Sequence, residues 1–202
     1  MLSRKITELV VTVGFIGKIK YCPGTFGSLP AFPLAYIIMH FVVSRQIVFS
    51  YLSSNLAEAQ IITLLLIGFI TCVVLFLAGV IFSSIYSREA GREDPKEVVI
   101  DELVGQLLVI TMSLISVAFI QHSKVIDFLS HRAIDFIFLF ALPFGLFRLF
   151  DIFKPWPINW IDNNIKGSIG IMLDDILAAI FAIIMQYAIV FVLADWFALE
   201  SA

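Results

Sequence analysis

The stretch IITLLLIGFITCVVLFLAGVIFSS, residues 61–84, decides the fold class, because it is uncharged and long enough to cross a lipid bilayer. A hydrocarbon core of about 30 Å requires about 20 apolar residues in a helix. Similar runs occur at 29–52, 98–120, 133–150 and 171–195. The whole chain is 60% hydrophobic and 14% charged, with a mean hydropathy of +1.01, which excludes a soluble globule. We therefore expect an all-α, multi-pass transmembrane bundle of about five spans in one domain, residues 1–202.

Three segments leave the number of spans open. Asp101 and Glu102 lie at the start of the third run, and the fourth run is short and contains Pro143 and Gly145, so four or six crossings remain alternatives. The apolar stretch 9–19 is too short to span and is flanked by basic residues. We interpret it as a short interfacial or partly inserted helix. A cleaved signal peptide is the alternative, but no small-residue cleavage site follows a long apolar core.

Basic residues indicate the direction of the spans. Ten of the 13 Lys and Arg residues fall in the N-terminal segment and in alternate loops, and three fall on the other side. The positive-inside rule then predicts a cytoplasmic N-terminus and an external C-terminus. The net charge is −3 with no dense basic run, so nothing points to nucleic acid as a partner. Two cysteines make neither a disulfide framework nor a zinc site.

Four polar clusters, at 23–28, 97–102, 148–157 and 162–175, adjoin the ends of apolar runs. Hydropathy alone defines the spans and Lys and Arg alone define their direction, and all four clusters nevertheless fall on the predicted cytoplasmic side. This convergence predicts one site at the inner surface of the membrane.

Two pairs of adjacent carboxylates are the strongest candidates for chemistry. Asp101 and Glu102 lie near the start of one apolar helix, and Asp174 and Asp175 near the start of another. Helix N-termini favour anions, so plain interfacial acids are the alternative interpretation. Ionised groups at membrane depth are costly unless paired or metal-bound, and oxygen ligands of this kind suit Mg²⁺. We expect Asp101, Asp174 and Asp175 to be catalytic and all four acids to contribute to the metal site. Glu97 should share a helix face with Asp101 at a spacing of four.

The segment 147–158 supplies cations beside these acids. Arg148, Asp151 and Lys154 follow one another at a spacing of three, and prolines at 155 and 157 end the helix. Arg148 and Lys154 are candidates for binding phosphate, and Asp151 for orienting Arg148 or ligating a metal. Basic side chains that reach toward the membrane surface are the alternative.

The turn at 23–28 brings two hydroxyl groups to the start of the first span. Thr25 and Ser28, with backbone N–H groups, are candidates for cradling a phosphate oxygen. A simple N-cap turn is an equally good interpretation. Residues 166–170 are interpreted as a loop that delivers the second acid pair.

The usual phosphatase nucleophiles are missing from the sequence. The histidines, at 40, 122 and 131, lie toward the predicted outer side. Cys22 is not followed by an arginine six positions later, where Ser28 stands, and no Asp-x-Asp-x-Thr stretch occurs. A phosphatase built from this chain must depend on metal and carboxylates.

Taken together, these stretches resemble the phosphatidylglycerophosphatase A family. The resemblance runs through PGTFGSL (23–29), IDELVGQLL (100–108), FRLFDIFKPWPI (147–158), and Asp162 followed by GSIGIMLDDILA (167–178). Two departures, Ser168 and Ala179 in place of expected glycines, affect the loop and no charged candidate.

The resemblance implies a multi-pass enzyme of the bacterial inner membrane that uses Mg²⁺. It would remove the terminal phosphate of phosphatidylglycerophosphate to give phosphatidylglycerol, while the acyl chains stay among the membrane lipids. In this hypothesis the two acid pairs bind one or two Mg²⁺ ions, and Arg148 and Lys154 stabilise charge on the phosphate. The nucleophile, the number of metal ions and the oligomeric state stay open.

Two other functions are alternatives. A CDP-alcohol phosphotransferase also uses membrane aspartates with a divalent metal, and Gly170 and Asp174 match part of its pattern, but Ala178 stands where another aspartate is required. A small cation transporter would place its charges near the middle of the membrane, whereas these cluster at one interface, and no inverted repeat is evident.

Overall fold

The computed structural model describes residues 2–49, 55–121 and 131–200, and these residues form helices and connecting turns without a strand. Five helical segments are long and apolar enough to cross a membrane, which confirms the predicted helical bundle of about five spans. They are Pro23–Ser44, Leu56–Ala90, Ile100–Ile120, Arg132–Phe153 and Ser168–Trp196.

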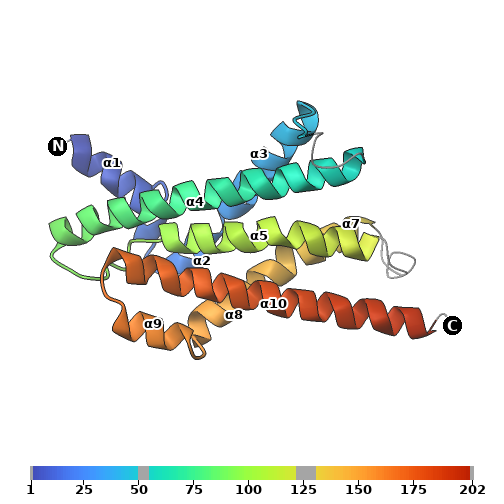
Figure 1. Ribbon diagram of the computed structural model, residues 1–202. Helices are drawn as coiled ribbons and strands as arrows, with labels where there is room; N and C mark the ends of the chain where they lie inside the picture. The colour runs from blue at the N-terminus through green and yellow to red at the C-terminus, as the bar shows by residue number, and fades with distance from the viewer. Residues whose placement is uncertain (1, 50–54, 122–130, 201–202) are drawn as a thin grey trace.

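Three long helices form the body of the bundle: α4 (Leu56–Ala90), α5 (Ile100–Gln121) and α10 (Ser168–Glu200). They run side by side, with α5 between the other two in the view of Figure 1. About two thirds of the apolar window of α5 is buried, against less than a third for each other span. The start of α5 is therefore held on several sides, which makes it a rigid base for a site.

The first span has a break that the sequence analysis did not predict. Residues 23–28 were expected to be a turn, but they form a short helix, α2 (Pro23–Ser28), followed by α3 (Ala31–Ser44). Pro23 occupies the first turn, where its missing N–H removes no helical hydrogen bond. The Ser28 hydroxyl donates to the Gly24 carbonyl, four residues earlier in the same helix, at 3.0 Å.

The N-terminal helix begins and ends earlier than expected. The apolar run 9–19 was predicted to be helical, but the helix α1 is Leu2–Val11, followed by a short 3₁₀ turn, η1 (Ile16–Lys18). Gly14 between them has φ +68°, a left-handed conformation that glycine adopts without strain. The Val99 N–H donates to the Val11 carbonyl at 2.9 Å. This bond ties α1 to the residue that precedes α5.

The fourth span is irregular around Pro143. It consists of α7 (His131–Phe136), a π-helical segment η2 (Ile137–Ala141) and α8 (Leu142–Phe153). A proline inside a helix cannot donate its backbone hydrogen bond, and a π-helical turn is one way to accommodate the lost bond. Lys154, with φ 41°, ends α8 in a left-handed conformation before Pro155. The short helix α9 (Ile158–Asn164) follows and leads back to α10.

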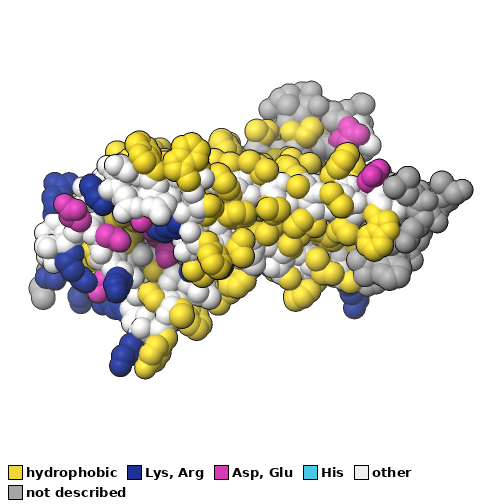
Figure 2. All heavy atoms as spheres, turned by 90° about the horizontal axis from the view of Figure 1, so that it is seen from below, with side chains coloured by type: hydrophobic (Ala, Val, Ile, Leu, Met, Phe, Trp, Pro, Cys, Tyr) yellow, Lys and Arg dark blue, Asp and Glu magenta, His cyan; other side chains and the backbone are white. Residues whose placement is uncertain are grey.

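Charged side chains gather at one end of the bundle. Figure 2 shows Lys, Arg, Asp and Glu crowded at its left, with hydrophobic side chains along the length of the molecule. Figure 1 has the same horizontal direction, and at that end lie α9, the start of α10 and the connection from α4 to α5. The body of the bundle carries exposed apolar residues such as Ile70, Leu77 and Ile184. This is the distribution expected of a membrane bundle with a hydrophilic site at one surface.

Candidate active site

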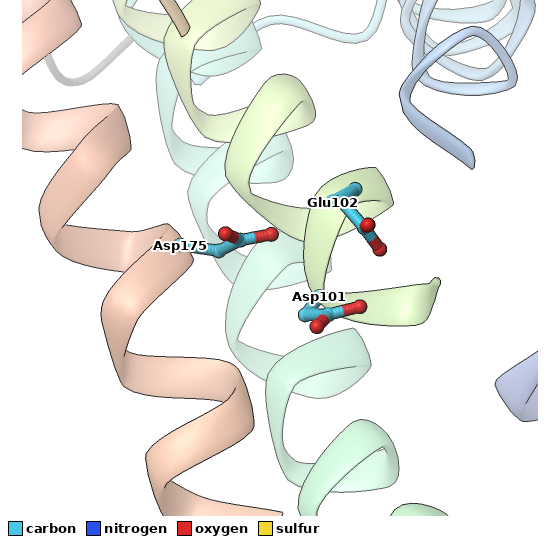
Figure 3. Close-up of side chains that lie close together, drawn as sticks. All are labelled: Asp101, Glu102 and Asp175. Carbon is cyan, nitrogen blue, oxygen red and sulfur yellow. The ribbon is translucent and has the colours of Figure 1, made fainter. Parts of the chain in front are cut away.

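Three carboxylates from two helices converge at the charged end. Asp101 and Glu102 belong to the first turn of α5, and Asp175 to the second turn of α10. One oxygen of each lies within 4.8 Å of the others. In Figure 3 the Asp175 carboxylate points from its own helix across to α5. The structure therefore brings together one member of the second predicted acid pair and both members of the first.

Gly105 explains how the two helices come so close. A Cβ atom at this position would lie 3.1 Å from the Asp175 backbone oxygen and 2.6 Å from the Phe147 ring. Gly105 follows Asp101 by four residues, so it lies on the same face of α5 one turn deeper in the bundle. The missing side chain lets α10 and α8 pack directly against α5 just below the carboxylates.

Each of these three carboxylates has one buried oxygen that receives no hydrogen bond from the described part of the chain. Asp101 Oδ1, Glu102 Oε2 and Asp175 Oδ2 are buried without a hydrogen-bond partner among the described residues, and Asp175 is only 3% exposed. Buried carboxylates repel one another and lose hydration, and a bound cation compensates for both effects. Carboxylate oxygens are the ligands that hard cations such as Mg²⁺ prefer. The three residues thus fit a divalent metal ion.

Asp174 is turned away from this group and toward Lys154. Its Oδ2 lies 2.6 Å from Lys154 Nζ, and its Oδ1 accepts the Asp175 N–H at 3.1 Å. Lys154 also bonds to Asp162 of α9 at 2.9 Å. Partial burial by itself lowers the pKa of Lys154, but Asp174 and Asp162 outweigh it and raise that pKa above its ordinary value. Lys154 thus joins α8, α9 and α10 as a charged bridge. Its predicted contact with phosphate, and metal ligation by Asp174, stay predictions.

Arg148 is likewise paired within the protein. Its Nη1 lies 2.6 Å from Asp151 Oδ2, and both side chains are mostly buried. A Cβ on Gly24 would lie 3.2 Å from Arg148 Nη2 and would clash with the Glu102 carboxylate. Gly24 therefore leaves room for these two side chains at the start of α2. Of the two roles predicted for Asp151, holding Arg148 is the one that the geometry favours.

A cavity of about 450 Å³ opens beside the carboxylates. Arg148, Thr25 and Ser28 do not line it, although Lys154 and Asp151 do. Ser28 is fully buried and Thr25 partly buried, so their predicted contact with phosphate stays a prediction. The lining residues come from the α4–α5 connection, the first turns of α5 and α10, and the last turns of α8 and α9, with Pro23 of α2. The polar ones are Glu93, Asp94, Lys96, Asp101, Glu102, Asp151, Lys154, Asp162, Asn163, Lys166, Asp174 and Asp175.

Sequence analysis missed part of this wall. Glu93, Asp94 and Lys96 were not singled out, although a charged loop directly before Asp101 was a usable signal. The prediction that Glu97 shares a helix face with Asp101 is wrong, because α5 begins only at Ile100.

Glu97 instead forms an ion pair with Arg92 at 3.1 Å. Partial burial raises the pKa of Glu97, but Arg92 more than offsets this and leaves that pKa below its ordinary value. The pair braces the connection that forms one wall of the cavity.

Comparisons with known proteins identify the family of this chain. The family model described as phosphatidylglycerophosphatase A matches residues 9–190. A Haemophilus influenzae protein of that name is 31% identical over 89% of this chain and 86% of its own length. The Escherichia coli protein of that name is 26% identical over 89% of this chain and 81% of its own.

A third relative carries a different name. A Bacteroides thetaiotaomicron protein, provisionally named a phosphatidylinositol-3-phosphatase, is 28% identical over 88% of this chain and 89% of its own length. No solved structure gives a significant match. The family match covers most of the chain, including the carboxylates of α5 and α10 and the segment between them, and the chain therefore belongs to the phosphatidylglycerophosphatase A family.

Proposed function

We propose that this protein hydrolyses the terminal phosphomonoester of phosphatidylglycerophosphate to give phosphatidylglycerol, and that it requires Mg²⁺. One observation carries the proposal. In a chain of this family, Asp101, Glu102 and Asp175 converge beside a cavity, and one buried oxygen of each has no hydrogen-bond partner among the described residues. The H. influenzae and E. coli relatives are named for this activity. An anionic lipid headgroup suits a hydrophilic cavity at the end of an apolar bundle.

Asp101, Glu102 and Asp175 would hold the metal ion. When bound there, Mg²⁺ would neutralise phosphate charge and lower the pKa of water in the cavity. Glu102 is kept in position by the start of α2, where Gly24 leaves room for its carboxylate. Asp175 is kept in position by the direct packing of α10 on α5 at Gly105. The protein thus presents three oxygens from rigid helices.

Arg148 and Lys154 prepare this site from two sides. Arg148 holds Asp151, and Lys154 holds Asp174 and Asp162, so neither cation is free in the unbound protein. Lys154 lines the cavity and can still direct one N–H toward a phosphate oxygen, since an ammonium group has three donors. Arg148 acts through the side chains that it holds.

The reaction would take place on the cytoplasmic side of the bacterial inner membrane. Lys and Arg predominate in the segments at the charged end, and the positive-inside rule assigns such segments to the cytoplasm. The named relatives are bacterial proteins. A lipid substrate could then present its headgroup to the cavity while its acyl chains remain in the inner leaflet.

Phosphate release from the purified protein in detergent tests the proposal. With phosphatidylglycerophosphate as substrate, we expect release that depends on Mg²⁺, stops with a chelator and resumes when Mg²⁺ is restored. Asp175→Asn should reduce kcat by at least about 100-fold. Asp195→Asn is the matched control, because Asp195 is an exposed aspartate near the far end of the same helix. Equal activity of the two variants would remove Asp175 from the mechanism.

One relative supports a second candidate substrate. The name of the B. thetaiotaomicron protein implies a phosphoinositide monoester, which shares the phosphate but carries an inositol ring. Assaying phosphatidylinositol 3-phosphate alongside phosphatidylglycerophosphate separates the two candidates through the ratio of kcat/KM values. Family membership favours both over a CDP-alcohol phosphotransferase or a cation transporter.

A further inference from the structure

The cavity has a strong excess of negative charge. Eight carboxylates and three lysines line it. A phosphorylated lipid approaching this wall is repelled unless cations face it, because like charges across a binding site disfavour association. Three of these carboxylates, Asp101, Glu102 and Asp175, lie together at the proposed metal site, and the other five are spread over the rest of the wall.

Two of the cations near the site already form ion pairs within the protein. Arg148 is paired with Asp151 and does not line the cavity, and Lys154 bridges Asp162 and Asp174. A cation held between two carboxylates has little net charge to offer an anionic ligand. Phosphatidylglycerophosphate carries a phosphodiester as well as its terminal phosphate, and binding of that second anionic group must therefore come from other side chains.

Lys96 and Lys166 are the remaining lysines of the cavity wall. Within the described ranges, neither has a carboxylate at ion-pairing distance. Lys166 Nζ donates to the Asp162 backbone carbonyl at 3.4 Å, which leaves its charge uncompensated. Both lysines therefore keep a full positive charge for a ligand.

The lysines and the buried carboxylates lie at different depths. Lys96 and Lys166 are exposed, in the connections that precede α5 and α10, whereas Asp101 and Glu102 are partly buried and Asp175 is only 3% exposed. A lipid headgroup that enters the cavity with its terminal phosphate first brings that phosphate to the carboxylates. The part of the headgroup nearer the acyl chains then lies beside the lysines. The wall thus has a buried metal-ligating part and an outer cationic part.

We infer that Lys96 and Lys166 bind the phosphodiester of a headgroup whose terminal phosphate sits at Asp101, Glu102 and Asp175. This inference rests on the proposed function and adds a specificity determinant to it. A substrate with two phosphates engages both parts of the wall, and a lipid with a single phosphomonoester engages only the inner part. The lysines therefore select phosphatidylglycerophosphate over phosphatidic acid.

Kinetics with the two lipids in neutral detergent micelles test this inference. Lys96→Ala and Lys166→Ala should each raise KM for phosphatidylglycerophosphate about three- to tenfold, and the double variant more, with kcat within about twofold of wild type. The activity toward phosphatidic acid should change little. Substituting arginine for each lysine should restore most of the lost affinity, because the charge is kept.

Lys20→Ala is the matched control for loss of a surface charge. Lys20 lies over the Tyr21 ring, outside the cavity, and its loss should leave both KM values unchanged. An unchanged KM in the double variant, or an equal loss with both lipids, overturns the inference while leaving the phosphatase activity intact. A wild-type protein that releases no phosphate from phosphatidylglycerophosphate overturns the proposed function itself, and the inference with it.

Discussion

Replacing Gly105 with alanine tests whether the packing of three helices positions the carboxylates. The added Cβ would lie 2.6 Å from Phe147 Cε2, whereas ordinary contact begins near 3.4 Å, so the ring must move by about 0.8 Å. Phe147 is fully buried in the hydrophobic core, so a displaced ring must press on its neighbours. The same Cβ would lie 3.1 Å from the Asp175 backbone oxygen. Both α8 and α10 must therefore shift away from α5.

The size of the effect follows from the cost of overpacking. One extra carbon in a tightly packed interior costs about 1–3 kcal/mol. For a chain of this length we expect Tm to fall by about 3–10 °C. Because Asp175 moves with its helix, kcat should fall about tenfold or more, since small displacements of catalytic groups reduce rates strongly. Thermal unfolding in detergent and phosphate release measure the two effects.

Gly145→Ala is the matched control for this experiment. Gly145 lies within α8, and a Cβ there would meet no atom within 4 Å. This variant should keep the activity and stability of wild type, with a small gain from helix propensity. If Gly105→Ala also matches wild type in both measurements, the direct packing at Gly105 does not position Asp175.

Three further predictions concern charge in the cavity. Asp175→Asn should leave Tm unchanged or raise it in the absence of metal, because it removes one of three closely spaced, mutually repelling carboxylates. A clear fall in Tm would show that repulsion among these carboxylates does not outweigh the contacts of Asp175. Lys154→Ala should lower both Tm and kcat, because it leaves the buried Asp174 without its cation and removes the ion pairs that join α9 to α10. Lys166→Ala is the control for Tm, and equal Tm values for the two variants would show that the Lys154 ion pairs do not stabilise the protein. Mg²⁺ at about 100 times its Kd should stabilise the wild type by about 2.7 kcal/mol and so raise its Tm, and it should leave the Tm of Asp101→Asn unchanged. An equal rise in Tm in both proteins would place the ion elsewhere.

Hydropathy predicts the architecture well because each span is long and nearly uncharged. It predicts the helix ends less well. The second span was expected at 61–84, and α4 extends to Leu56–Ala90, since polar residues such as Ser87 and Arg88 continue a helix without any hydrophobic signal. Around Gly14 and Pro143 the local backbone departs from a regular helix, which a window average does not detect.

The site was predictable only where charge occurs in an unexpected place. Asp101, Glu102 and Asp175 stand out because they lie in apolar helices, and the structure brings them together. Lys96 lies in a loop where charge is ordinary, and only the position of that loop directly before Asp101 pointed to the cavity wall. The ion pair between Asp174 and Lys154 joins residues 20 positions apart on α10 and at the end of α8, and the sequence alone does not show which cation a carboxylate contacts across two helices.

The length of α4 bears on how a lipid reaches the cavity. Its 35 residues extend for about 52 Å at 1.5 Å per residue, and a hydrocarbon layer is about 30 Å thick. Tilt within the usual range of up to about 40° absorbs only part of this excess, so the helix projects beyond the acyl region. The hydrophilic end of the projection contains Arg88 and adjoins the wall around Glu93. Catalysis at the proposed site would then take place near the level of the phosphates of neighbouring lipids, where the headgroup of a substrate already lies.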